Sequence, residues 1–228
     1  MPASQTRIQS YFRTRYGPFA VVVIIALCQA FIADSVGIIT GSLVWMLPVV
    51  TLVLLLLSIF AYPARKSDLT KRARFLSIAV IVFITLVNIS CMVWFITDML
   101  SPQSVTEGHT LLIAGLILWV VNVGIYALAY WELDSGGPEM RATGGASLFR
   151  NKTAPDIVFP QQDDDSGRVS KNWTPSFIDY LYMSVTAATS FSPAAATPYS
   201  SVMKVLLGSE SLISLATLGI IIARAIFL

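Results

Sequence analysis

Long apolar runs separated by short polar connections dominate the hydropathy pattern of the chain. The runs occupy residues 17–33, 36–62, 75–100, 110–131 and 202–228. Each is close to the roughly 20 residues that an α-helix needs to cross the hydrocarbon core of a bilayer. The pattern therefore predicts five transmembrane helices.

A sixth segment, residues 177–191, is shorter and mixes hydroxyl groups with apolar residues in "FIDYLYMSVTAATSF". At 3.6 residues per turn its polar side chains fall within an arc of about 100°. These side chains are Asp179, Tyr182, Thr186, Thr189 and Ser190. Periodicity alone leaves open whether this helix crosses the membrane or turns back at Phe191-Ser192-Pro193.

Composition supports a membrane protein. Of the 228 residues, 55% are hydrophobic and only 12% are charged, which is too few to cover a soluble domain with polar surface. The net charge of +2 arises at the flanks of the apolar runs and requires no nucleic-acid partner. The expected partner is the lipid bilayer.

Lysine and arginine gather in two connections. Arg7, Arg13 and Arg15 precede the first run, and five further basic residues lie between Arg65 and Arg74. Because basic residues near membrane-spanning helices favour the cytoplasmic side, we expect residues 1–16 to be a cytoplasmic N-terminus before a four-helix region at 17–131. The same rule places the long loop at 132–174 in the cytoplasm.

The loop at 132–174 differs sharply from its surroundings, with glycine pairs, prolines and charges of both signs. Connections of about forty residues are uncommon unless they are disordered or functional. We expect this loop either to lack order in part or to fold back as a cap on the cytoplasmic face. It is our candidate for docking a cytoplasmic partner.

Residues that could carry catalysis are scarce. His109 is the only histidine, and neither an H-E-x-x-H nor a G-x-S-x-G motif is present. The sequence predicts no catalytic residues, no metal ligands and no cofactor, so an enzyme is the least favoured class.

Several polar residues interrupt the apolar runs. Asn88 and Asn122 are expected to face the bundle interior, as links between helices or as substrate contacts. Glu210 lies inside the last run, and an acid at that depth is a candidate functional residue. It can pair with Lys204, pair with a hydroxyl of a neighbouring helix, or handle an ion.

The C-terminal region, residues 175–228, carries a resemblance. "YMSVTAATSFSPAAATP" followed by "LLGSESLISLATLGIIIAR" resembles the pore helix, filter and inner helix of the potassium-channel superfamily, with Thr186 and Thr189 matching the spaced threonines. With "YWELDSGGP", "DYLYMSVTAATSFSP" and a terminal "ARA", the chain as a whole resembles a group of uncharacterised bacterial membrane proteins. The resemblance implies a helix-turn-helix module in a bacterial plasma membrane.

The filter position departs from that family. It reads Ser190-Phe191-Ser192-Pro193-Ala194, without the glycines whose backbone freedom aligns carbonyl groups toward potassium. Potassium selectivity is not expected. In addition, the family's filter faces outside, and the charge rule agrees with that only if residues 177–191 cross the membrane. We therefore predict an all-α bundle of six transmembrane helices, the fifth short and either spanning or re-entrant, with both termini cytoplasmic.

Two functions fit these predictions. The first is a channel- or transporter-like protein that moves a small ion or solute along a path lined by the polar residues of 177–190 and Glu210. The second is a non-conducting scaffold or sensor that keeps a channel-like fold. A continuous wet cavity at Asp179 and Glu210 would favour the first, and a dry bundle that satisfies both acids would favour the second. A path between subunits would require a homo-oligomer.

Overall fold

The computed structural model describes residues 16–32, 34, 48–53, 67–100, 108–138, 141, 155–162, 173–190 and 196–226. The helices are Tyr16–Ile32, a helical segment at 48–53, α3 (Ser67–Leu100), α4 (Gly108–Leu133), α6 (Phe177–Ser190) and α7 (Ser201–Ile226). The shorter elements are two 3₁₀ turns, η2 (Asp134–Gly136) and η3 (Pro160–Gln162), and two strands, β1 (Ile157–Val158) and β2 (Thr197–Pro198).

Three helices are long and apolar enough to cross a membrane, with spans at Phe75–Thr97, Leu112–Gly136 and Ser201–Ala223. They coincide with three of the predicted spans. Large apolar side chains are exposed on them, including Leu86, Leu116 and Leu212, as expected of surfaces that face lipid. Tyr16–Ile32 is a shorter apolar helix at the first predicted span. Of the second predicted span, only 48–53 lies within the described residues.

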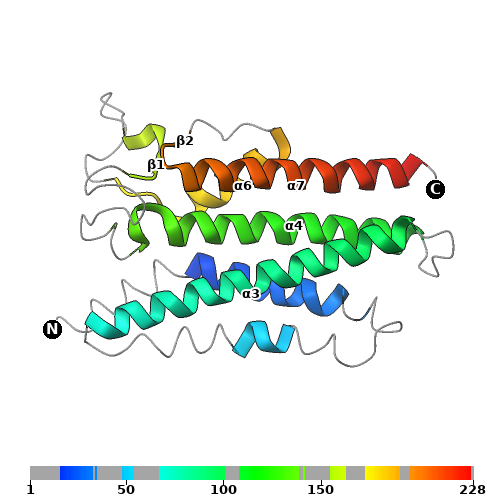
Figure 1. Cartoon of the computed structure of the whole chain (residues 1–228), viewed down its shortest axis with the longest axis horizontal. Helices are drawn as coiled ribbons and strands as arrows, with labels where there is room; N and C mark the ends of the chain where they lie inside the picture. Colours follow the sequence, from blue (N-terminus) through cyan, green and yellow to red (C-terminus); the bar gives the residue numbers. More distant parts are fainter. Residues whose placement is uncertain are drawn as a thin grey trace.

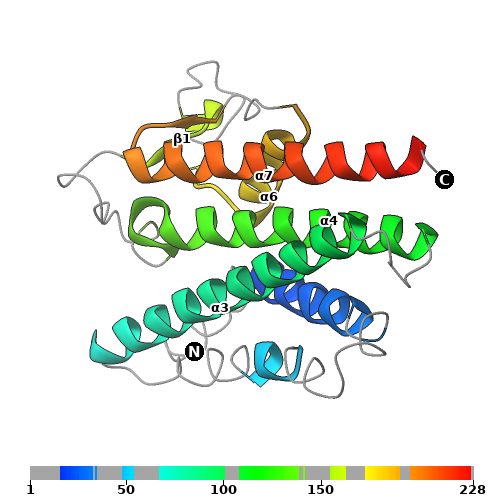
Figure 2. The same ribbon diagram turned by 45° about the vertical axis from the view of Figure 1, so that its right-hand side comes forward.

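Helix α4 is the centre of the bundle. It packs against α3 on one side and against α6 and α7 on the other (Figures 1 and 2). Between α3 and α4, the Asn88 side-chain amide donates to Asn122 Oδ1 at 3.5 Å, and both side chains are buried. The predicted inward orientation of these two residues is confirmed, and they link the two helices.

A small two-stranded sheet closes one end of the bundle. Strand β1 pairs antiparallel with β2, with Ile157 opposite Pro198 and Val158 opposite Thr197. The Tyr199 amide donates to the Asp156 carbonyl at 2.8 Å, which fixes the start of α7 beside β1. These strands lie where α4 ends and α7 begins (Figure 1). We call η2, β1, η3 and β2 the cap, and this end of the bundle the capped end.

Helix α6 enters the bundle from the capped end, and the chain returns to the same end. Tyr180, in the first turn of α6, donates to Asp134 of the cap, and β2, which follows α6 in the chain, also belongs to the cap. The 14 residues of α6 span only about 21 Å, less than the roughly 30 Å of a hydrocarbon core. Of the two courses that the sequence left open for residues 177–191, this length fits re-entry better than a full crossing. The predicted turn at 191–193 lies outside the described residues.

The direction of the helices shows where the two ends of the described chain lie. The first helix begins at the capped end, because a Cβ on Gly17 would lie 2.7 Å from Phe177 Cδ1 at the start of α6. Helix α7 also begins at the capped end and runs away from it (Figure 1). The described chain therefore starts and finishes at opposite ends of the bundle, whereas the six-span arrangement places both ends on one side.

Candidate functional site

A buried acid sits where α4, α6 and α7 meet. Glu210 of α7 is 0% exposed. Tyr130 of α4 donates its hydroxyl to Glu210 Oε2 at 2.6 Å, and the hydroxyl of Ser184 of α6 contacts Glu210 Oε1. Each of the three helices therefore contributes one polar side chain. We call Glu210, Tyr130 and Ser184 the Glu210 site.

Helical spacing produces this meeting point. Tyr126 and Tyr130 lie one turn apart on α4, and they reach the adjacent residues Ser209 and Glu210 of α7. The Tyr126 and Ser209 hydroxyl oxygens are 2.8 Å apart. The two tyrosines of α4 thus fix the position of α7 along the helix axis and its rotation about that axis.

Small residues let α6 approach α7 closely. Ala187 and Ala188 are fully buried between the helices, and Ser211 Oγ of α7 donates to the Ala187 carbonyl at 3.2 Å. Close approach of this kind through small side chains is typical of helices in membranes. It places Ser184, one turn before Ala188, against Glu210.

The partners of Glu210 are neutral. Among the described residues, no lysine or arginine lies within ion-pair distance of its carboxyl group, and Lys204, six residues earlier on α7, is exposed. Of the three roles open to Glu210 from the sequence, the structure shows pairing with hydroxyls of neighbouring helices. A carboxyl group surrounded in this way is costly to ionise, since burial disfavours its charged form.

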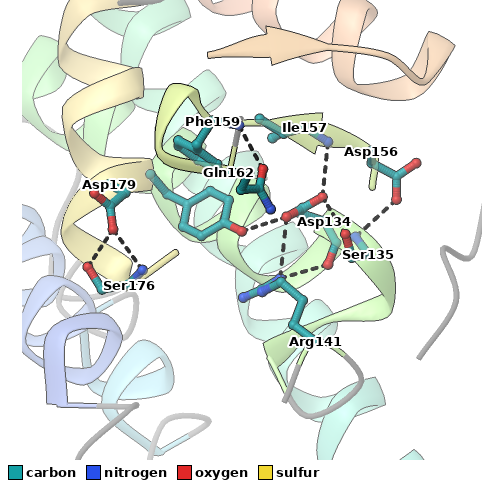
Figure 3. A network of polar contacts seen from close by, with 10 residues as sticks. Asp134, Ser135, Arg141, Asp156, Ile157, Phe159, Gln162, Ser176 and Asp179 are labelled. Carbon is teal, nitrogen blue, oxygen red and sulfur yellow. Dashed lines mark hydrogen bonds and ion pairs between the residues drawn. The ribbon is translucent and has the colours of Figure 1, made fainter. Parts of the chain in front are cut away.

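A second buried acid, Asp134, organises the capped end (Figure 3). Its Oδ2 accepts the Tyr180 hydroxyl at 2.5 Å, and its Oδ1 accepts the Ile157 amide at 3.1 Å and the Ser135 hydroxyl at 2.9 Å. Arg141 donates to the Asp134 carbonyl at 2.7 Å and lies 3.9 Å from Oδ2. Asp134 therefore joins the end of α4 to α6, to β1 and to Arg141.

The sequence "DSGG" makes this arrangement sterically accessible. Ser135, Gly136 and Gly137 have φ values of 51°, 82° and 96°, in the left-handed region that glycine adopts readily. The turn ends α4 and presents the Ser135 amide to Asp156 Oδ2 at 3.0 Å. The glycine pair of the loop thus has a defined structural role.

Aromatic rings enclose Asp134 and Arg141. The Arg141 guanidinium lies 5.1 Å from the Tyr180 ring centroid and 5.9 Å from that of Trp131. Phe159 packs edge-on against Tyr180 at 5.2 Å and against Trp173 at 6.0 Å. The described part of the loop is therefore held on the helix ends by both polar and apolar contacts.

The predicted pathway residues of α6 do not join Glu210. Asp179 accepts the Ser176 amide and hydroxyl, each at 2.7 Å, and so caps the start of α6. Tyr182 is 62% exposed, and Thr189 is exposed with its hydroxyl bonded to the Val185 carbonyl. Thr186 likewise bonds to the carbonyl of Met183. The side chain of Ser190 and residues 191–193 lie outside the described parts.

Asp179 and Tyr182 do come together, but at the cap. They line a pocket of about 290 Å³ between α6 and the cap. Its other lining residues are Phe159, Pro160, Gln161, Met183 and Ala196. Among the described residues, no three His, Cys, Asp or Glu side chains gather closely enough to hold a metal ion.

Sequence reasoning missed Tyr130, Ser184, Asp134 and Tyr180. Tyr180 and Ser184 are four residues apart on α6, on the face that also buries Met183 and Ala187. The signal was present as polar groups recurring at i and i+4 within an apolar face. It was hidden by the larger polar stripe on the other side of the same helix.

Fold and site together define a helical membrane protein with a buried acid between three helices and a cap on one end. Comparison of the chain with protein-family models, with curated proteins and with solved structures finds no match.

Removing either hydroxyl of the Glu210 site should destabilise the protein. Tyr130→Phe and Ser184→Ala are each expected to lower the free energy of unfolding by about 1–3 kcal/mol, because each leaves a buried polar atom of Glu210 without its hydrogen-bond partner. Thermal unfolding in detergent measures the loss. Thr189→Ala is the matched control, with an expected change within about 0.5 kcal/mol because Thr189 is exposed. Equal losses in all three variants would contradict the structural role of the site.

Proposed function

We propose that the chain is a multi-pass protein of the bacterial plasma membrane that conducts no ion through a single copy and serves as a scaffold or sensor. One observation carries the proposal. The residues predicted to line a path are divided between a closed site at Glu210 and the outer face of α6. The pocket that Asp179 and Tyr182 line at the cap does not include Glu210.

The surroundings of Glu210 support the absence of a path through one copy. Met203 and Ala187 are 0% exposed and Leu207 is 6% exposed, and all three belong to the apolar cluster packed between α4, α6 and α7. An ion entering this region would lose its hydration without gaining a ring of carbonyl or carboxylate ligands.

The proposal includes an orientation. The basic residues between Arg65 and Arg74 precede or begin α3, which starts at the capped end (Figure 1). We propose that the capped end faces the cytoplasm and that α7 runs outward. The cap then presents its exposed residues, Pro160, Gln161 and Gln162, to a cytoplasmic partner. The order helix, returning helix, helix in α4, α6 and α7 also supports descent from a pore-loop module.

A second function, transport coupled to Glu210, rests on a specific observation. A carboxyl group inside a transmembrane span with no described cation beside it is a feature of proton and ion pathways. In this alternative, α6 would have to move to admit water or an ion to Glu210.

Ion flux into liposomes separates the two functions. Purified protein, shown by circular dichroism and gel filtration to be folded, is reconstituted and tested with potassium, sodium, protons and chloride. We expect no flux above that of empty liposomes. Flux that Glu210→Gln abolishes, with Thr186→Val as the control on the outer face of α6, would overturn the scaffold or sensor proposal and establish transport.

A further inference from the structure

Two hydroxyl groups on one face of α6 contact two buried acids. Tyr180 and Ser184 lie one turn apart, and their hydroxyls contact Asp134 and Glu210 respectively. Asp134 belongs to η2, directly after α4, and Glu210 belongs to α7. Any movement of α6 that breaks one of these contacts therefore disturbs the other.

The contacts of Ser184 set a limit on where hydrogens can lie. Its oxygen is 2.8 Å from the Val123 carbonyl and also contacts Glu210 Oε1. A serine hydroxyl has a single hydrogen to donate. If Glu210 were ionised, both neighbours of the Ser184 oxygen would be hydrogen-bond acceptors, and Ser184 has only one hydrogen to donate. One of the two oxygen–oxygen contacts would then contain no hydrogen.

A protonated Glu210 carboxyl group supplies the missing hydrogen. Glu210 Oε1–H donates to Ser184 Oγ, Ser184 Oγ–H donates to the Val123 carbonyl, and Tyr130 donates to Glu210 Oε2. Each contact then holds one hydrogen. We infer that Glu210 is a proton-binding site, occupied in this structure, whose proton links α7 through Ser184 to α4.

The other ionisable groups near the site do not supply a compensating charge. From α4, Tyr126 and Tyr130 face α7, and both are hydrogen-bonded there. The acids Glu132 and Asp134 lie further along, at the end of α4. From α6, Asp179 is bonded to Ser176 at the helix start. An ionised Glu210 would face no described cation.

Loss of the proton has a structural consequence at the cap. Glu210 would carry a charge in an apolar setting, and one oxygen–oxygen contact at Ser184 would become repulsive. Separation of α6 from α7 relieves both, and Tyr180 then moves relative to Asp134. This coupling rests on the proposed sensor function, with the proton of Glu210 as the stimulus. Proton release from Glu210 loosens the cap.

Infrared spectroscopy tests the proton directly. At neutral pH, wild-type protein should show the carbonyl stretch of a protonated carboxylic acid, which shifts to lower frequency in D₂O. Glu210→Gln should lose this band, and Asp134→Asn should retain it. A glutamine at 210 offers one donor to Ser184 and one acceptor to Tyr130, so the variant is expected to fold. A spectrum that Glu210→Gln leaves unchanged would overturn the inference.

Hydrogen exchange at the cap tests the coupling. As pH rises, exchange of the Ile157 amide, which donates to Asp134, should accelerate in the wild type beyond the base-catalysed rise of an unprotected amide, and should follow only that rise in Glu210→Gln. Equal acceleration in both proteins would refute the coupling while leaving the infrared result intact. Both measurements are independent of the flux assay, so the proton site and the proposed absence of conduction can fail separately.

Discussion

Replacing Asp134 with alanine is expected to lower the free energy of unfolding by about 3–5 kcal/mol, the range for removing one partner of a buried charged pair. Asp134 is 1% exposed and accepts hydrogen bonds from Tyr180 and Ile157. Its removal leaves these donors without an acceptor and leaves Arg141 enclosed by two aromatic rings without its carboxylate. The cap should detach from α4 and α6, seen as faster proteolysis between residues 134 and 162 and a lower melting temperature in detergent.

Asp179→Ala is the matched control for this substitution. Both residues are aspartates that accept hydrogen bonds near the capped end, but Asp179 is only partly buried and its partners belong to one turn of α6. Loss of a helix cap costs about 1 kcal/mol. A similar loss in both variants would mean that Asp134 is no more than a local cap and that α6 is held by other contacts.

Apolar length was enough to predict the membrane-spanning helices. The runs at 75–100, 110–131 and 202–228 coincide with α3, α4 and α7 because the bilayer requires about 20 apolar residues whatever the tertiary contacts are. The course of α6 could not be found in this way. It depends on the pairing of Ile157 with Pro198 and on the bond between Asp134 and Tyr180, which join residues about forty positions apart.

The polar stripe of α6 does not converge on Glu210, and there is a physical reason. A threonine in a helix can donate its hydroxyl to a carbonyl three or four residues earlier. Thr186 and Thr189 do so with Met183 and Val185. Such residues tolerate an outward position because their polar atoms are already satisfied. Glu210 has no such local partner, and its carboxyl group contacts the hydroxyls of Tyr130 and Ser184 on neighbouring helices, which is one of the roles that the sequence left open.

Gly115→Leu is expected to lower the free energy of unfolding by about 3 kcal/mol, at the upper end of the usual cost of overpacking. Gly115 of α4 lies between α3 and α7. A Cβ at this position would be 2.8 Å from Phe95 Cζ and 2.9 Å from Ile221 Cγ1. Because both neighbours lie on other helices, the added side chain must push α3 or α7 away from α4. Thermal unfolding in detergent measures the loss.

Gly208→Leu is the control that isolates packing from helix propensity. Gly208 is also a glycine inside a long apolar helix, but a Cβ there would meet nothing within 4 Å. The substitution adds the same side chain toward lipid and should not lower the free energy of unfolding, because leucine favours a helix over glycine by about 0.5–1 kcal/mol. If Gly115→Leu proved equally harmless, α3 and α7 could not both lie against α4 at this depth. The packing of α3 and α7 around Gly115 of α4 would then be contradicted.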